Sequence, residues 1–314
     1  MALAATLTHQ GAAGNLVGAL RVMAPPDEQC TLAGQPQIQV WDAQDNLVIQ
    51  SAPPDAGGVT VTLSAGVGAE VGFQWRNWCG AQPPAPFTVV LILPNGQGEI
   101  RSVPRGGGAE GTPLGAAPNC SNPSQPSALR ATGPFKAAPG QVFVMPDNST
   151  RFVGERFLAY WRTHGGLALN GYPISDEFDQ QLADGQTYRV QYFERVRMED
   201  HPENQAPYDV LLGQFGRQFH PADPAVPPIP GQTYFQATGH HVAPDFFQYW
   251  QANGGLAQFG YPISEEIQEQ LEDGQTYTVQ YFERARFERH PENQPPWNIE
   301  LGQFGRRALA EAGH

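Results

Sequence analysis

The segment Gly171-Tyr172-Pro173-Ile174-Ser175 returns unchanged as Gly260-Tyr261-Pro262-Ile263-Ser264. A second segment, VQYFER at residues 190–195, returns at residues 279–284, which is the same shift of 89 positions. Over the 61 positions from 157 to 217, 40 residues are identical to the residue 89 positions later, with no gap. Identity over this length shows an internal duplication, which is the sequence sign of a repeat architecture.

The duplication divides the chain of 314 residues into three parts. We expect an N-terminal domain over residues 1–139, which ends in a Gly- and Pro-rich segment. A first copy of the duplicated sequence follows over 140–228, and a second copy over 229–314. The boundary between the copies, residues 220–230, holds five prolines and favours a stiff, extended spacer.

Each copy predicts a small α+β fold. In the second copy, Pro244-Asp245 can open a helix that Gly254-Gly255 ends, and Ser264 is placed to cap a second short helix. Asp273-Gly274 favours a hairpin turn. Alternating apolar and polar residues then predict three strands, at residues 277–281, 286–289 and 297–301. The expected copy is therefore a helix, a helical turn and a three-stranded meander.

Short strand-like runs separated by turn residues fill the N-terminal part. Their regular spacing, about 10–12 residues, is typical of an antiparallel β-sandwich. The seven runs lie at residues 16–22, 37–41, 47–50, 59–63, 69–75, 87–93 and 99–103. The sequence therefore predicts a multidomain protein, in which an Ig-like antiparallel β-sandwich precedes two tandem small α+β repeats.

The charge of the chain excludes several classes of function. There are 18 Lys and Arg against 31 Asp and Glu, which gives a net charge of −13. Residues 1–139 carry 8 acidic and 6 basic groups, whereas residues 140–314 carry 23 and 12, so −11 lies on the duplicated half. Such an acidic protein does not attract nucleic acid or an anionic membrane over long range. No apolar run reaches 18 residues, so we expect no membrane insertion.

The duplicated half resembles a known kind of repeat. A helix ended by Gly-Gly, the Gly-Tyr-Pro-Ile-Ser turn with its acidic pair, Asp-Gly, a strand ending in Tyr-Phe and a closing Leu-Gly resemble LGFP-type repeats, in the form found in exported proteins of Chloroflexi. The resemblance covers residues 140–314. It implies a protein held at the cell envelope, on peptidoglycan or its glycans. The sequence departs from the family in having Gly-Tyr-Pro for Gly-Phe-Pro, and Phe-Glu-Arg where the family turn is glycine-rich.

The N-terminal part resembles a secreted bacterial β-sandwich domain of unknown function. The resemblance rests on residues 30–36 (CTLAGQP), 75–80 (WRNWCG) and the region around Cys120, and it covers roughly residues 10–135. We expect a disulfide between Cys79 and Cys120, with Cys30–Cys79 as the alternative. A disulfide implies an oxidising compartment. Residues 1–7 are apolar but short and lack a basic region, so we expect a start Met on a mature exported chain rather than a complete signal peptide.

One polar cluster resembles the machinery of a hydrolase or a metal site. Glu194, Glu199, His201 and Glu203 return as Glu283, Glu288, His290 and Glu292. Two carboxylates and an imidazole can act as acid and base or hold a metal. Because arginines are interleaved with them and the cluster is duplicated intact, we favour a structural role, with His-Pro-Glu-Asn as a turn whose imidazole bonds backbone. No phosphate loop, dinucleotide fingerprint or catalytic motif is present, so we expect no cofactor and no metal.

Repeated aromatic residues are the other candidates for a binding role. Most of them must form the small core of each copy, because so short a segment has little else to bury. Tyr172 and Tyr261 follow the glycine turn, and Tyr208 and Trp297 follow the His-Pro-Glu-Asn turn. These four are the best candidates for an exposed platform on which a sugar ring could stack.

Three functions are open on the sequence. The leading expectation is a non-enzymatic protein, outside the cell or on its surface, whose repeats bind or anchor it to envelope polysaccharide or to a surface protein. The alternative is a self-associating subunit of a surface layer or filament. The third is a hydrolase with an unrecognised acid–base site.

Overall fold

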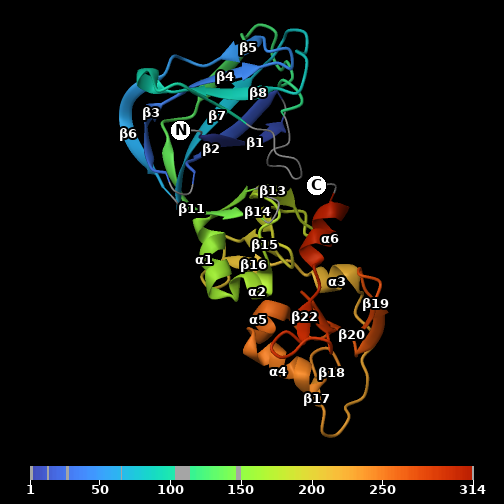
Figure 1. Cartoon of the computed structure of the whole chain (residues 1–314). Helices are drawn as coiled ribbons and strands as arrows, with labels where there is room; N and C mark the ends of the chain where they lie inside the picture. Colours follow the sequence, from blue (N-terminus) through green and yellow to red (C-terminus); the bar gives the residue numbers. More distant parts are fainter. Residues whose placement is uncertain are drawn as a thin grey trace. The chain divides into compact units, whose positions relative to one another are not determined.

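The chain divides into two compact units (Figure 1). The computed structural model describes residues 3–12, 14–25, 28–64, 66–102, 114–145 and 150–312, so most of the Gly-rich segment near residue 106 lies outside the described residues. The N-terminal unit holds Met1–Glu155 with Ser175–Phe178, and the C-terminal unit holds Arg156–Ile174 with Asp179–His314. Antiparallel sheets dominate and helices are few, so the fold is β-rich and multidomain.

Twelve strands belong to the N-terminal unit as the structure describes it. They are β1 (Ala4–Ala12), β2 (Asn15–Met23), β3 (Cys30–Gln35), β4 (Gln37–Trp41), β5 (Leu47–Gln50), β6 (Asp55–Leu63), β7 (Val67–Arg76), β8 (Thr88–Ile92), β9 (Glu99–Arg101), β10 (Ala128–Ala131), β11 (Lys136–Val144) and β12 (Thr150–Gly154). One sheet runs β1-β2-β7-β11-β12 with β10 also on β7, a second runs β5-β4-β8-β9, and β3 pairs with β6.

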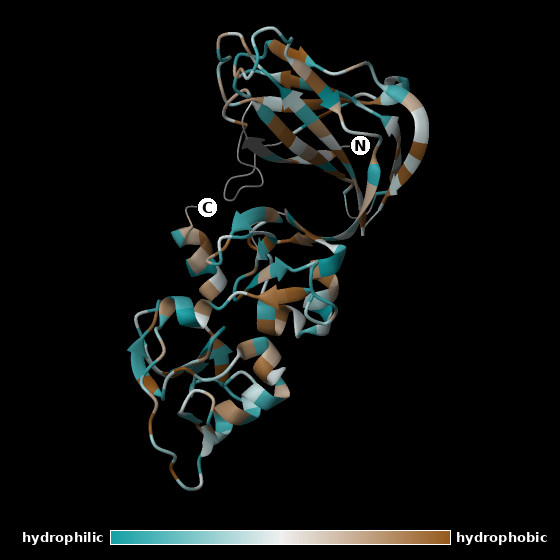
Figure 2. Ribbon diagram, turned by 180° about the vertical axis from the view of Figure 1, so that it is seen from behind, coloured by the Kyte–Doolittle hydropathy of each residue, from teal (hydrophilic) through white to brown (hydrophobic). Residues whose placement is uncertain are grey.

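One hydrophobic core joins these sheets. Leu20 and Phe73 from the first sheet and Val40 and Leu91 from the second lie in the same buried cluster. Apolar and polar residues alternate along the strands, as the brown and teal bands of Figure 2 show, because successive side chains of a strand point to opposite faces. Trp75 is fully buried in this core, and its ring meets that of Phe87 edge-on at 5.8 Å between centroids.

A disulfide and one asparagine hold the segment that follows the second sheet. Cys79 and Cys120 are bonded, which is the pairing expected first from the sequence, and Cys30 is a free thiol. Asn77 adopts a φ of 58°, which Asn tolerates better than most residues. Its Oδ1 accepts hydrogen bonds from the backbone N–H groups of Ser121 and Asn122, at 2.9 and 2.8 Å. The covalent and polar links therefore fix the same loop.

From their first helix onward, the two copies of the duplicated sequence have the same order of elements. The first holds α1 (Glu155–Thr163), α2 (Gly166–Asn170), β13 (Phe178–Gln181), β14 (Thr187–Tyr192), β15 (Arg197–Asp200), β16 (Val210–Leu212) and α3 (Phe215–Phe219). The second holds β17 (Thr233–Phe235), β18 (His240–Val242), α4 (Pro244–Ala252), α5 (Gly255–Phe259), β19 (Ile267–Gln270), β20 (Thr276–Tyr281), β21 (Arg286–Arg289), β22 (Ile299–Leu301) and α6 (Phe304–Glu311). The sheets run β13-β14-β15-β16 and β19-β20-β21-β22.

The expectation of a helix after Ser264 is wrong. The second short helix is α5, which lies before Ser264, and the segment after it is strand β19. Ser264 Oγ accepts a hydrogen bond from the backbone N–H of Tyr281 at 3.0 Å, so this hydroxyl serves the neighbouring strand rather than a helix end. Glu265 accepts the backbone N–H of His241 at 2.9 Å instead of lying at a helix N-terminus. Each copy therefore has a four-stranded sheet rather than a three-stranded meander.

The proline-rich connector runs along the second copy. It has no regular secondary structure between residues 221 and 229. The backbone N–H of Asp223 donates to the carbonyl of Ile263 at 2.8 Å, and that of Val226 donates to the carbonyl of Gly239 at 2.9 Å.

Within the described residues, no helix has the length and apolar character needed to cross a membrane. The boundaries expected at residues 140 and 229 stay predictions, since both copies contribute to one compact unit.

Candidate ligand-binding cleft

Trp297 and Tyr208 are large aromatic side chains on the surface of the C-terminal unit. Their exposed fractions are 66 % and 65 %, and they occupy the same position in the two copies. The turn before Trp297 is fixed by backbone hydrogen bonds, from Asn293 N–H to the carbonyl of His290 at 3.0 Å and from Trp297 N–H to the carbonyl of Gln294 at 2.9 Å. Tyr and Trp are enriched at interfaces, because their rings combine an apolar body with a polar group, so both residues are candidates for contact with a ligand.

Trp297 lines a cleft of about 840 Å³ within the C-terminal unit. Helix α2 and Arg195 of the first copy form one part of the lining, and helix α4 and the segment leading into β22 of the second copy form the rest. The lining residues are Leu167, Ala168, Leu169, Arg195, Asp245, Gln248, Tyr249, Ala252, Asn253, Pro295, Pro296, Trp297, Asn298, Ile299, Glu300 and Leu301. A volume of this size with an apolar wall and a few polar groups is typical of a site for a small or chain-like ligand.

Two carboxylates at the cleft are held by neighbouring side chains. Arg289 donates to both carboxylate oxygens of Asp245, at 2.8 and 3.0 Å. Burial favours the neutral form of Asp245, but these hydrogen bonds outweigh it and lower the pKa of the carboxyl. Glu300 Oε1 accepts a hydrogen bond from Asn293 Nδ2 at 2.9 Å. The cleft therefore presents fixed acceptors beside its apolar wall.

Tyr249 forms a half-buried part of the same wall. Its ring lies 5.2 Å from that of Phe287 and 6.1 Å from that of Phe259, measured between centroids, so the core of the second copy fixes its position. Burial raises the pKa of Tyr249 to about 12. As in any tyrosine at neutral pH, the protonated hydroxyl can donate a hydrogen bond.

The four aromatic candidates from the sequence do not gather in one place. Trp297 lines the cleft, whereas Tyr208 lines a smaller hollow of about 520 Å³ with Asn204, Gln205, Ala206 and Leu211. Tyr172 and Tyr261 are half-buried and line neither. Their backbone N–H groups donate to Glu194 and Glu283, at 3.1 Å in both copies, so the tyrosines belong to the turns of the repeat.

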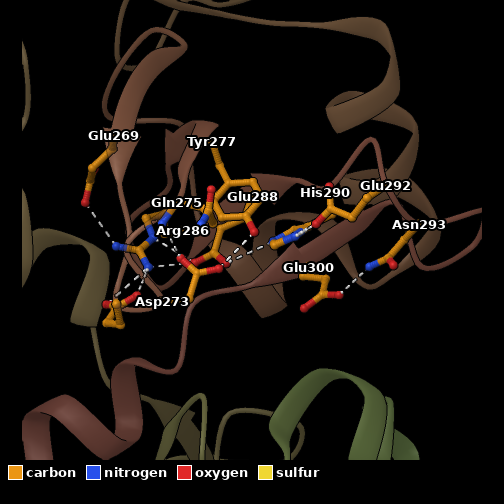
Figure 3. A network of polar contacts seen from close by, with 11 residues as sticks. Glu269, Asp273, Gln275, Tyr277, Arg286, Glu288, His290, Glu292, Asn293 and Glu300 are labelled. Carbon is orange, nitrogen blue, oxygen red and sulfur yellow. Dashed lines mark hydrogen bonds and ion pairs between the residues drawn. The ribbon is translucent and has the colours of Figure 1, made fainter.

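Strand β21 carries the polar cluster of the second copy (Figure 3). The guanidinium of Arg286, which is 2 % exposed, donates to Glu288 at 2.8 Å and to Glu269 at 3.1 Å. It also pairs with Glu272 at 3.0 Å. Burial lowers the pKa of Arg286, but the charges of Glu288 and Glu272 and its hydrogen bonds outweigh this effect, so the pKa is raised. Charge pairing thus compensates the burial of this arginine.

His290 lies between two glutamates, as Figure 3 shows. Its Nδ1 is 2.8 Å from Glu292 Oε1 and its Nε2 is 3.5 Å from Glu288 Oε2. Burial disfavours the charged imidazole, but the hydrogen bonds with Glu292 and Glu288 and the charges of Glu300 and Glu292 together outweigh it and raise the pKa of His290. The first copy repeats the arrangement, with His201 Nδ1 2.8 Å from Glu203 Oε1 and Nε2 3.4 Å from Glu199 Oε2. The expectation that the imidazole forms a hydrogen bond with the backbone is therefore wrong, because both ring nitrogens are within hydrogen-bond distance of carboxylate oxygens.

Glu194 and Glu283 do not belong to this cluster, although the sequence grouped them with it. Glu194 Oε1 pairs with Arg306 at 2.5 Å, and Glu283 Oε1 pairs with Arg217 at 2.6 Å. Each of these ion pairs joins one copy to the other. The sequence could not separate them, because the partners lie 112 and 66 positions away.

In both copies, the residues of the polar cluster form ion pairs and hydrogen bonds with one another. The carboxylates of Glu199 and Glu288 each bond an arginine and a histidine of their own copy. Among the described residues, no group of three or more His, Cys, Asp and Glu side chains is placed to hold a metal ion. Arg195, Asp245, Tyr249 and Glu300 of the cleft were missed from the sequence, although Arg195 and Tyr249 have identical residues, Arg284 and Tyr160, in the other copy.

One comparison with known proteins bears on the N-terminal unit. A family model described as Domain of unknown function (DUF4232) matches residues 1–134. No curated protein matches the chain. The matched residues stop before the first copy, so the cleft at Trp297 lies in the part of the chain that the family model leaves out.

Proposed function

We propose that the protein is a non-enzymatic, exported surface protein whose C-terminal unit binds a glycan of the cell envelope in the cleft at Trp297. The single observation that carries this proposal is the exposed indole of Trp297 at the edge of a cleft of about 840 Å³. An aromatic face packs against the C–H groups of a sugar ring, and an exposed aromatic residue beside a hollow is suited to that contact.

The polar lining supports a sugar rather than an apolar ligand. Sugar hydroxyls both donate and accept, so they need donors and acceptors together. Asp245 and Glu300 supply acceptors, Arg195 supplies donors, and the amides of Gln248 and Asn298 supply both. The acidic character of the duplicated half disfavours anionic polymers such as nucleic acid.

The proposal includes the architecture that would carry the site. We infer that the N-terminal unit is an Ig-like β-sandwich, since residues of its two larger sheets share one buried core. The copies at 140–228 and 229–314 are then two small α+β repeats of the LGFP-like type. The disulfide between Cys79 and Cys120 is compatible with export to an oxidising compartment.

A polysaccharide pull-down with the full chain tests the function. The panel holds insoluble peptidoglycan, cellulose and chitin, and the bound fraction is measured for wild type, Trp297→Ala and Tyr208→Ala. Tyr208 is the matched control because it has the same exposure and the same place in the repeat but lies outside the cleft. We expect wild type and Tyr208→Ala to bind peptidoglycan and Trp297→Ala to lose at least tenfold in affinity.

Equal losses from the two variants would contradict a site at the cleft, and no binding to any polymer would contradict the glycan proposal. Light scattering on the same samples addresses the alternative. Large ordered oligomers together with an empty glycan panel would favour a surface-layer or filament subunit.

A further inference from the structure

The two copies contact each other through reciprocal hydrogen bonds. The backbone N–H of Arg217 in the first copy donates to the carbonyl of Glu283 in the second, at 3.1 Å. The backbone N–H of Arg306 donates in return to the carbonyl of Glu194, at 3.2 Å. Arg306 stands 89 positions after Arg217, and Glu283 stands 89 positions after Glu194. The same two positions of the repeat therefore meet twice, with the roles of the copies exchanged.

The side chains of the same four residues form two ion pairs between the copies, and these pairs are reciprocal in the same way. Arg217 pairs with Glu283 at 2.6 Å, and Arg306 pairs with Glu194 at 2.5 Å. The glutamates are largely buried at this contact, with side-chain exposures of 15 % and 16 %. A contact of i with j that is accompanied by a contact of j with i is the mark of an isologous interface, the kind that joins two identical subunits about a two-fold axis.

Two glycines allow the backbones to meet. A Cβ added at Gly216 would lie 1.7 Å from the carbonyl oxygen of Phe282, and one added at Gly305 would lie 1.8 Å from that of Phe193. These are again equivalent positions. Since backbone atoms cannot move aside as a flexible side chain can, each site requires glycine for the approach of the other copy.

Ring contacts and one buried hydrogen bond complete the contact. The rings of Phe219 on α3 and Phe304 on α6 lie 5.0 Å apart between centroids, at an edge-on angle of 61°. The guanidinium of Arg307 lies 4.1 Å from the centre of the Phe219 ring. Gln258 Nε2 donates to Asn170 Oδ1 at 3.2 Å in a buried hydrogen bond between the copies. The interface therefore has an interior of its own, not only a rim of ion pairs.

We infer that this face of the repeat is self-complementary, and that its partner is a second copy of the same module, in the same chain or in another chain. The inference is independent of the ligand that the cleft binds. An isologous pair uses the same patch on both members and is closed, so a chain with two copies satisfies its own interface. A filament would need a different surface.

Charge reversal in one copy tests the inference on the full chain. In the variant Arg217→Glu with Glu194→Arg, both ion pairs between the copies of one chain become repulsive. Two such chains, however, can pair first copy with first copy and second copy with second copy, and all four ion pairs are then attractive. Exchange of modules between chains is a low-cost route to a dimer. We therefore expect this variant to self-associate more strongly than wild type in sedimentation experiments at low salt.

Two further variants make the result decisive. Adding Arg306→Glu and Glu283→Arg restores attraction within one chain, so the fourfold variant should return to the association state of wild type. The control, Arg156→Asp with Asp200→Arg, reverses an ion pair inside the first copy and should leave association unchanged. If the first variant unfolds the C-terminal unit, rescue of folding by the fourfold variant supports the inference. A first variant that stays folded with the mass of wild type would overturn it.

Discussion

One buried charge, that of Arg286, is compensated inside the second copy. Arg286 is 2 % exposed and is compensated by Glu288, Glu269 and Glu272. Burial raises the pKa of Glu288, and the charge of Arg286 only partly offsets this. The pair is therefore interdependent, because either charge left alone would lie in a poorly solvated site.

Arg286→Met should lower the free energy of unfolding of the C-terminal unit by about 3 kcal/mol, since it leaves Glu288 buried without its main partner. Urea unfolding followed by circular dichroism measures the loss. Arg189→Met is the control, because the pair of Arg189 with Asp179 is more exposed and should be worth less than about 1 kcal/mol. Equal losses for the two variants would contradict the role given to burial.

The pH dependence of stability should reveal the His290–Glu292 pair. The pKa of His290 is raised in the folded protein, so protonated His290 stabilises the fold. This contribution is complete below the unfolded pKa of about 6.5 and is lost as pH rises through the higher folded value. The stability difference between wild type and His290→Gln should therefore shrink as pH rises above about 6.5.

Thermal unfolding in a buffer series measures this difference for wild type and His290→Gln under the same conditions. Subtracting the stability of the variant from that of wild type at each pH removes the contribution of groups that titrate in the same way in both proteins. A difference that is constant over the range, or that grows with pH, would show that the carboxylates do not hold the imidazolium.

At the scale of elements, the sequence predicted most strands whose pattern is local. The runs at 37–41 and 47–50 coincide with β4 and β5, where alternation and a turn at Asp45 suffice. Helix α4 begins at Pro244, as expected. The strand β19 was missed because its residues, Ile267 to Gln270, are rich in Glu and Gln, which locally favour a helix. Pairing of Ile267 with Val279 overrides this preference.

The candidate site was only partly visible in the sequence for a similar reason. Trp297 stood out because it is an aromatic residue that follows the repeated His-Pro-Glu-Asn turn. The cleft beside it depends on how Leu167 and Arg195 of one copy meet Tyr249 and Glu300 of the other. No local pattern encodes a contact over such separations, so a duplication shows that two copies exist but not how they pair.

Helix α3 offers a test of that pairing. Gly216→Ala should destabilise the C-terminal unit by about 1–3 kcal/mol, because the new Cβ would meet a backbone oxygen that cannot yield locally. Gln218→Ala on the same helix is exposed and should change stability by less than about 0.5 kcal/mol. Differential scanning calorimetry compares the two, and a Gly216→Ala variant as stable as wild type would exclude the close approach.

At the scale of the whole molecule, the disulfide lies in one unit and the ion pairs discussed above lie in the other. Their contributions to stability can therefore be measured separately. The bond between Cys79 and Cys120 lies in the N-terminal unit and closes a loop with a sequence separation of 41. Closing a loop of this length restricts the unfolded chain and stabilises by about 3–4 kcal/mol.

The double variant Cys79→Ser, Cys120→Ser should lower the unfolding temperature of the N-terminal unit and leave that of the C-terminal unit unchanged. Calorimetry on the full chain, with Cys30→Ser as the control for loss of a thiol, measures both transitions. A shift of both transitions by the same amount would mean that the units unfold together.

The central claim is that the cleft at Trp297 binds a glycan, and calorimetric titration tests it most directly. Soluble oligosaccharides released from peptidoglycan are titrated into wild type, Trp297→Ala and Tyr208→Ala. We expect one saturable binding event for wild type and for Tyr208→Ala, and a loss of at least tenfold in affinity for Trp297→Ala. Unchanged affinity in a folded Trp297→Ala variant would contradict the claim.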